Sequence, residues 1–448
     1  MMGGHFLRSR RRRFACGPLA CALAIAVTWT SSAFAAPADE PSKYTGPGSC
    51  SSPSCHGGVQ PRTETSVQQN EYGIWVVKDK HAGAFAVLSN PVAARMAKIL
   101  GLPQADTAPK CLACHALDVP ADQRARTFDA TDGVSCESCH GPASNWLGPH
   151  TTRGWTHEKS IEVGMYDTRD LTRRSERCLS CHLGTKDKTV DHEMIAAGHP
   201  DLYFELASFS AVMPRHWKEP LDKDPWLEVR TLAIGQAVQL REQLRRVARE
   251  AQAGVWPEYA QLDCFACHHS LTAAKDSWQQ ERGYTGRRPG NPPWNLSRYA
   301  ILRQVINESD RTAGTQLEAG VTRLYGLIST IGNDRAQVAV QATATADAAD
   351  RVAQSVAAAK FDQALTARLL KSISGDADYI SMQGERAAEQ AAMALDSLFV
   401  AYARNTKVGN EPQVRAAIQG LFQQLNDPSS YNAFKFAQQM RGVNALLP

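Results

Sequence analysis

The sequence predicts a mainly α-helical protein with little regular sheet, in which a compact N-terminal part is followed by a C-terminal helical part. All ten cysteines beyond residue 35 lie in five pairs between Cys50 and Cys267. The chain from 294 to 448 contains neither cysteine nor histidine, and its apolar residues recur at helical spacing. We therefore expect a signal peptide over 1–35, a compact domain over 36–293 and a helical domain over 294–448.

The helical domain is predicted from apolar residues that recur every three or four positions. Its three clearest stripes are Phe361, Leu365, Leu369 and Ile373; Ala391, Leu395, Leu398 and Tyr402; and Val414, Ile418, Leu421 and Leu425. A matching stripe precedes the fifth cysteine pair, at Ala233, Ala237, Leu240, Leu244 and Val247. These helices either form a bundle or coat the compact domain. We expect them to act as a scaffold or as a surface for a partner.

A histidine directly follows each of the five cysteine pairs. The motifs are Cys50, Cys55 and His56; Cys111, Cys114 and His115; Cys136, Cys139 and His140; Cys178, Cys181 and His182; and Cys264, Cys267 and His268. C-x-x-C-H is the attachment signature of c-type haem, in which the two thiols bond to the porphyrin and the histidine binds the iron. Zinc knuckles, thioredoxin-like pairs and disulfides need no histidine at that position.

The first motif has four residues between its cysteines instead of two. A surface disulfide between Cys50 and Cys55 is the alternative there. The five motifs span 219 residues, about 44 for each haem. So little chain cannot enclose five porphyrins in separate cores, because protein interiors are close-packed. The sequence thus predicts a compact multihaem cytochrome c domain, with five covalently bound haem c groups packed against one another.

The N-terminus is typical of an export signal. Arg8 and Arg10–Arg13 precede a mostly apolar stretch, and Ala33-Phe34-Ala35 offers a cleavage site. Its removal takes away five arginines and no acidic residue, which lowers the formal net charge from +4 to −1. This charge argues against a nucleic-acid partner. No later stretch is long enough to span a membrane, so we expect a soluble periplasmic protein that receives its haems from the cytochrome c maturation machinery after export.

Seven further histidines beyond the signal can complete the irons from the opposite side: His81, His150, His157, His192, His199, His216 and His269. A second imidazole favours fast electron transfer, whereas an empty sixth position lets a small molecule bind. His157 lies among polar residues and is expected to be solvated. His269 directly follows a motif histidine, so it cannot reach the same iron and is expected at the rim of the haem region.

His192 and His199 are seven residues apart, nearly on one face of a helix. Pro200 places His199 at a helix end. Both are candidate ligands for the irons of His182 and His268, with an exposed surface position as the alternative. His216, in Pro-Arg-His-Trp, is either a ligand or a hydrogen-bonded structural residue.

Three segments resemble one known family. Asp132-Gly-Val-Ser-Cys-Glu-Ser-Cys-His-Gly-Pro-Ala-Ser144 resembles the third haem site of the cytochrome c-554-like multihaem family. Lys110–His115 resembles its second site, and Lys80-His81-Ala-Gly-Ala the stretch after its first. The resemblance covers roughly residues 46 to 200. The stretched first motif, the fifth motif and the helical tail depart from the family.

The resemblance implies a set of ligand pairs. His81 would face the iron held by His140, and His150 the iron held by His56. The iron held by His115 would lack a strong sixth ligand.

Our leading hypothesis is a periplasmic protein that transfers electrons between redox partners, such as quinol-oxidising components and terminal reductases or oxidases. The alternative is an oxidoreductase that acts on a small nitrogen or sulfur compound at a five-coordinate haem. Whether the protein is an enzyme therefore stays open, with a carrier favoured. All five motif ligands are histidine, whereas pentahaem nitrite reductases use lysine at their catalytic haem. A third hypothesis is that the helical tail docks the protein onto a larger complex.

Overall fold

Helices form where the apolar stripes predict them. The structure is a computed structural model that describes residues 41–64, 67–268, 291–330 and 332–448. The chain divides into Met1–Pro41 and Ser42–Pro448, and every element below belongs to the second unit. The expected signal peptide and His269 lie outside the described residues.

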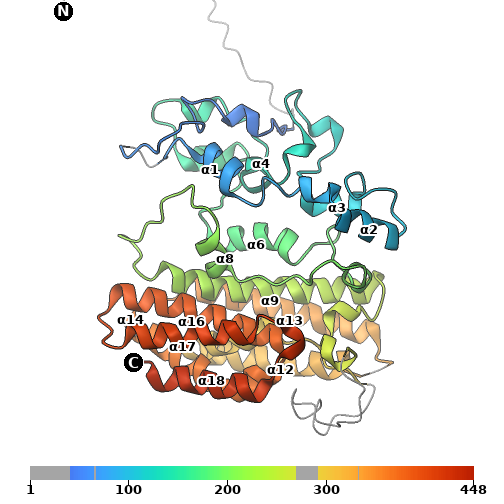
Figure 1. The fold of residues 1–448 in the computed structure, drawn as a ribbon, viewed down its shortest axis with the longest axis vertical. Coiled ribbons are helices and arrows are strands. Elements are labelled where there is room, and N and C mark those ends of the chain that lie inside the picture. The colour runs from blue at the N-terminus through green and yellow to red at the C-terminus, as the bar shows by residue number, and fades with distance from the viewer. Residues whose placement is uncertain (1–40, 65–66, 269–290, 331) are drawn as a thin grey trace, which may run out of the picture. The chain divides into compact units, whose positions relative to one another are not determined.

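The N-terminal part of this unit consists of short helices joined by long irregular segments (Figure 1). Its α-helices are α1 (Glu71–Lys78), α2 (Pro91–Ile99), α3 (Pro109–His115), α4 (Cys136–His140), α5 (His157–Glu162), α6 (Leu171–His182), α7 (His192–Ala196) and α8 (Leu206–Val212). Short 3₁₀ helices occupy Pro47–Cys50, Ala86–Ser89, Ala121–Gln123, Ala130–Asp132, Pro149–Thr151, Tyr259–Gln261 and Cys264–Ala266. Side-chain caps begin several of these helices; the Asp170 carboxylate, for example, accepts from the Arg173 amide at the start of α6.

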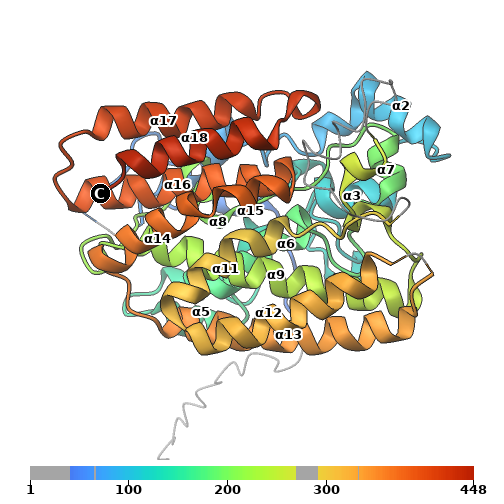
Figure 2. The ribbon, with the colours of Figure 1, turned by 90° about the horizontal axis from the view of Figure 1, so that it is seen from below.

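The C-terminal part is a bundle of longer helices. They are α9 (Leu227–Ala253), α11 (Ser297–Ser309), α12 (Arg311–Ile328), α13 (Arg335–Ala358), α14 (Gln363–Gly375), α15 (Ala377–Met382), α16 (Glu385–Asn405), α17 (Glu411–Gln424) and α18 (Ala433–Leu446), with a 3₁₀ turn at Pro428–Ser430. Figure 2 shows α16, α17 and α18 side by side; α11 and α9 contact α16, and α12 and α13 lie beyond them on the far side of the bundle. The predicted stripes are the buried faces of α9, α14, α16 and α17.

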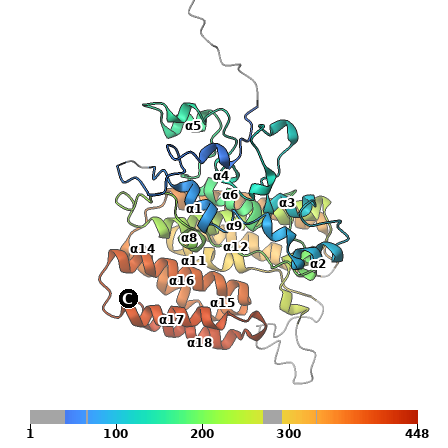
Figure 3. The same ribbon diagram turned by 45° about the horizontal axis from the view of Figure 1, so that its top comes forward.

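The longest helix, α9, belongs to the core of this bundle. It packs along α13, where alanines such as Ala342, Ala346 and Ala349 are almost fully buried. Small side chains let two helix backbones approach closely. The other side of α9 contacts α6 and α8 of the N-terminal part, and α16 contacts α8. One hydrophobic core therefore runs from Leu171 to Leu447. Figure 1 shows α6 and α8 between the short N-terminal helices and the bundle, and Figure 3 shows α16, α17 and α18 one below another in the bundle.

The mainly α-helical fold with little sheet is confirmed. In the part of the chain that the structure describes, β-structure is limited to two isolated bridges, Tyr44 with Arg124 and Leu262 with Trp294. No helix among these residues is long and apolar enough to cross a membrane.

Candidate haem-binding site

A helical turn positions most of the cysteine–histidine motifs. Three of them end a helix, so that the motif histidine is the last residue of α3, α4 or α6. Residues three and four apart lie on one face of a helix, so each turn presents two thiols and an imidazole together. In the fifth motif a 3₁₀ turn does the same, and the His268 amide donates to the Cys264 carbonyl at 2.8 Å.

The stretched first motif closes the same kind of turn. The His56 amide donates to the Cys50 carbonyl at 3.2 Å, although these residues are six positions apart. The additional residues form a turn of their own, in which the Cys55 amide donates to the Ser52 carbonyl at 2.8 Å. The first motif therefore returns its histidine to the position that the shorter spacing gives elsewhere. No disulfide bond joins the ten motif cysteines in the structure.

Four motif histidines each face a second imidazole. The ring centroids are 6.2 Å apart for His56 and His150, 6.2 Å for His182 and His81, 6.4 Å for His115 and His199, and 6.1 Å for His268 and His192. A metal–imidazole nitrogen bond is about 2 Å long, so two rings on opposite sides of one ion have centroids about 6 Å apart. The pairs thus have the separation that an iron between two axial histidines requires.

Hydrogen bonds at Nδ1 leave the Nε2 atom of most of these rings available for a metal. Fixing one ring nitrogen in this way orients a histidine ligand and raises its basicity. The Nδ1 partners are Glu71 Oε2 at 2.9 Å for His56, Asp79 Oδ1 at 2.9 Å for His81, the Ala84 carbonyl at 2.9 Å for His115, the Trp146 carbonyl at 3.0 Å for His150 and the Pro200 carbonyl at 2.8 Å for His199. This pattern fits bis-histidine haem ligation.

Sequence reasoning missed the two acidic partners. Asp79 could have been found, because it lies two residues before His81 and is 7 % exposed. Glu71 had no local signal, since it is 15 residues from His56. Hydrogen bonding to Glu71 raises the pKa of His56, and hydrogen bonding to Asp79 raises the pKa of His81.

Two pairings that the family resemblance implies are wrong for this chain. His81 faces His182 instead of His140. Its carbonyl accepts from the Val134 amide, close to the third motif, but the Asp79 hydrogen bond holds its ring against the end of α6. His115, which was expected to lack a partner, faces His199. The implied pair of His150 and His56 does lie together.

The structure agrees only in part with the positions that the sequence predicts for His192, His199 and His157. His192 begins α7 and faces His268, one of its two candidate irons. His199 lies beyond the end of α7, after Gly198 with its positive φ of 113°, so the two histidines do not share a helix face. His199 consequently faces His115 instead of His182 or His268. His157, which was expected to be solvated, is 17% exposed, and its Nε2 lies 3.0 Å from Asp167 Oδ1.

His140 differs from the other motif histidines. Among the residues that the structure describes, the other four motif histidines are each paired with a second imidazole ring, and His140 is not. Its Nδ1 is buried and has no hydrogen-bond partner. Burial lowers the pKa of His140 to about 4, and the nearby charge of His216 acts in the same direction. His216 lies on the segment between α8 and α9, with its ring 5.0 Å from that of Trp217.

Contacts between motifs show which sites are neighbours. Hydrogen bonding between the Cys50 and Cys136 thiols lowers the pKa of Cys50 and raises that of Cys136. Hydrogen bonding between Cys114 and Cys181 lowers the pKa of Cys181 to about 5 and raises that of Cys114. The first site therefore adjoins the third, and the second adjoins the fourth.

Two more contacts connect these pairs of sites. The charge of Cys139 in the third motif acts on Cys178 in the fourth. Beside the second motif, Lys110 forms an ion pair of 2.7 Å with Asp191, the residue before His192. Since His192 faces His268, this ion pair connects the second site to the fifth. The sites thus form one connected series, in the order first, third, fourth, second and fifth.

A buried glutamate joins the first and third sites. Glu137 lies inside the third motif and is 1 % exposed. Its carboxylate accepts from the amides of Thr45, Gly46 and Ala143 at 2.7–2.9 Å. Several amide donors are needed to compensate a buried carboxylate. Glu137 therefore anchors the segment that leads into Cys50.

The described residues contain no group of three or more histidine, cysteine, aspartate and glutamate side chains arranged to hold a metal ion. The thiols and imidazoles are instead distributed over the five motifs, each of which has two thiols and one imidazole. Covalent haem needs this distribution, because its porphyrin supplies the other iron ligands.

Comparisons with known proteins agree with the geometry over the N-terminal part. The family model described as "Cytochrome c554 and c-prime" matches residues 50–141. Cytochrome c-554 of Nitrosomonas europaea is 35% identical over 83 residues, which are 16% of this chain and 34% of that protein. The chain thus spans about a third of the length of this relative. No solved structure matches the chain. Residues 50–141, which hold the first three motifs, are accordingly similar to the cytochrome c-554 family over about a fifth of the chain.

Proposed function

We propose that this protein is a periplasmic multihaem c-type cytochrome that carries five covalently bound haem c groups and transfers electrons between redox partners. The observation that carries the proposal is the set of four imidazole pairs with centroids 6.1–6.4 Å apart. Each pair joins a motif histidine to a histidine from elsewhere in the chain. An iron with two axial imidazoles changes oxidation state with little rearrangement.

Bound haem c would supply one-electron chemistry at each site. The chain holds each ring from both sides and fixes the imidazole orientation through its Nδ1 partner. The connected series of sites has the Cys50–His56 motif at one end and the Cys264–His268 motif at the other. This series supports a carrier, because redox centres must be neighbours for electrons to pass between them. Its partners would be other redox proteins, such as quinol-oxidising components and terminal reductases or oxidases.

A second candidate function rests on His140. Its iron would be open to a small nitrogen or sulfur compound if no ligand reached the opposite side. His216 supports the carrier instead, because it is the neighbouring histidine whose charge acts most on His140. His157 is held by Asp167 through its Nε2. We therefore propose His216 as the sixth ligand of the His140 iron, which gives five bis-histidine sites.

Mass spectrometry and electron paramagnetic resonance test the proposal together. The intact mature chain should weigh about 3 kDa more than its polypeptide, at roughly 0.6 kDa for each of five haems. The ferric protein should give low-spin signals throughout. A chain mass without this increment would overturn haem attachment. A high-spin signal that shifts when nitrite, hydroxylamine or nitric oxide is added would favour the enzyme.

His216→Ala is the specific probe of the His140 site. We expect it to convert one of the five haems to the high-spin form, because the alanine leaves the iron without its second imidazole. His157→Ala is the matched control, and it should leave every haem low-spin. If His216→Ala also leaves the low-spin count unchanged, His216 is not the sixth ligand.

A further inference from the structure

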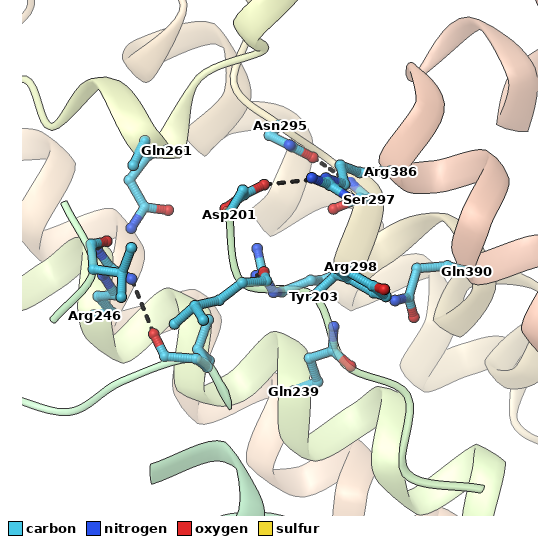
Figure 4. A pocket seen from close by; sticks show the side chains of 14 residues that line it. Asp201, Tyr203, Gln239, Arg246, Gln261, Asn295, Ser297, Arg298, Arg386 and Gln390 are labelled. Atoms are coloured by element: carbon cyan, nitrogen blue, oxygen red, sulfur yellow. Dashed lines mark hydrogen bonds and ion pairs between the residues drawn. The ribbon is translucent and has the colours of Figure 1, made fainter. Parts of the chain in front are cut away.

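A cavity between the haem-binding part and the bundle is lined by three arginines (Figure 4). They are Arg246 on α9, Arg298 on α11 and Arg386 on α16, so the bundle supplies all three. The opposite wall comes from the segments around Leu183 and Asp201.

Two of the arginines are already neutralised by carboxylates. Arg246 Nε donates to Glu250 at 2.7 Å, and its Nη atoms donate to two carbonyls. Arg386 donates to Asp201 at 3.1 Å and to Glu389 at 2.7 Å. Their charges are therefore matched within the protein.

Arg298 is the exception. Its hydrogen bond within the described part of the chain is one donation from Nη2 to the Leu202 carbonyl at 2.9 Å. A guanidinium has five N–H donors. Arg298 is partly buried, and a charge taken out of water is costly unless it is paired. Burial lowers the pKa of Arg298 to about 10, and the charges of Arg246 and Arg386 add to this effect while Asp201 opposes it. The cavity thus presents a guanidinium whose charge the neighbouring residues compensate only in part.

The cavity adjoins the fifth haem-attachment motif. The charges of Asp201 and Arg386 act on the Cys264 thiol. Ala260 and Gln261, which line the cavity, lie just before that motif. Asp201 also lies two residues after His199. An anionic oxygen that enters the cavity would therefore be close to the end of the connected series of sites.

We propose that this cavity binds a carboxylate or a similar small oxyanion on Arg298. Arg298 would donate two parallel N–H···O bonds, the geometry that arginine forms with carboxylates. The anion has two possible sources: a propionate of the haem at the fifth motif, or a free oxyanion from solution. The propionate source rests on the proposed haem attachment at Cys264 and Cys267, whereas the free-anion source does not.

The test compares Arg298→Met with Arg298→Lys in the full-length haem-loaded protein. Arg323→Met, at an exposed arginine of α12 that does not line the cavity, is the matched control. A propionate on Arg298 predicts that Arg298→Met shifts the midpoint potential of one haem to a lower value, because a positive charge stabilises the reduced form. Arg298→Lys should restore most of the shift, and Arg323→Met should leave all potentials unchanged.

A free oxyanion predicts a different result. Sodium acetate or sodium sulfate should raise the melting temperature of the wild type relative to sodium chloride at equal ionic strength. Arg298→Met should abolish this rise. If acetate and sulfate have no such effect while the potential shifts, the source is the propionate.

The proposal is overturned if Arg298→Met raises the melting temperature and changes neither a potential nor the response to anions. Arg298 would then be an uncompensated buried charge whose removal only stabilises the fold. Intact mass separates this failure from a failure of the proposed function. If the chain carries five haems and Arg298→Met changes neither a potential nor the response to anions, only the proposed anion site is refuted. If the chain lacks the fifth haem, the propionate cannot be the anion.

Discussion

At the scale of single residues, the third motif contains a buried carboxylate that is held by backbone amides. Glu137 is buried and receives three backbone amides. We predict that Glu137→Gln lowers the free energy of unfolding by about 2 kcal/mol, because charge-assisted hydrogen bonds are lost and an amide hydrogen faces amide donors. Thermal or chemical unfolding measures the loss, and hydrogen exchange at Thr45, Gly46 and Ala143 should become faster.

The matched control for this variant is Glu158→Gln. Glu158 lies in the first turn of α5 and is exposed, so its substitution should leave the free energy of unfolding almost unchanged. Equal effects of the two substitutions would mean that Glu137 does not anchor the segment before Cys50.

Sequence alone identified the ligand candidates but not their partners. C-x-x-C-H is a local pattern, and the two thiols and the imidazole of one motif meet within a single turn. A facing histidine comes from elsewhere in the chain, and tertiary packing decides which motif it meets. His81 illustrates this. Its carbonyl accepts a hydrogen bond from the Val134 amide, just before the third motif, but its ring faces His182 of the fourth motif.

At the scale of helices, Arg241 connects three elements. Its side chain is 4 % exposed and donates to Glu176 on α6 at 2.5 Å, to Glu242 on α9 at 2.8 Å and to Asp350 on α13 at 2.8 Å. We predict that Arg241→Met destabilises the protein by about 2–3 kcal/mol, below the usual range for a buried pair because the carboxylates are partly exposed. Chemical denaturation at neutral pH measures the loss.

We also predict that the stability lost in Arg241→Met depends on pH. Burial alone would raise the pKa of Asp350, but its hydrogen bond to Arg241 and the charge of Arg241 outweigh burial and lower that pKa. A lowered carboxyl pKa contributes stability that is present above the unfolded value of about 3.9 and is lost as the pH falls through the folded value. The stability difference between wild type and Arg241→Met should therefore shrink below about pH 4.

Arg245→Met is the matched control, because Arg245 contacts the same Glu242 and Asp350 but is 42% exposed. We expect a loss below about 1 kcal/mol. A pH-independent difference for Arg241→Met would show that its aliphatic packing, and not the ion pairs, accounts for the loss.

The helices themselves were largely predictable, and their neighbours were not. Periodicity marks which face of a helix is buried, so the stripes at Ala233–Val247 and Ala391–Tyr402 became the cores of α9 and α16. Periodicity does not say what covers that face. That α9 packs along α13 was therefore not evident, because α9 precedes the fifth motif and lies before the predicted domain boundary at residue 293.

At the scale of the whole molecule, the bundle completes the core on which the haem-binding part rests. Helix α9 packs against α13 and α16, and its residues Leu232, Val238 and Leu240 are each 0 % exposed. Removing 294–448 would expose this face to water at a cost of about 25 cal/mol for each Å² of apolar surface. We predict that a chain ending at residue 293 aggregates or is degraded instead of accumulating with five haems.

Size-exclusion chromatography and haem content per chain measure this outcome, with the full-length protein as the reference. Co-expression of 294–448 as a separate chain should restore part of the soluble haem-loaded protein, because the contacts between the two segments are non-covalent packing and hydrogen bonds. If the shortened chain were instead monodisperse and carried five haems, the haem-binding part would fold alone. The bundle would then be a separately folded module. The hypothesis that it docks the protein onto a larger complex would be favoured over the hypothesis that it is a scaffold.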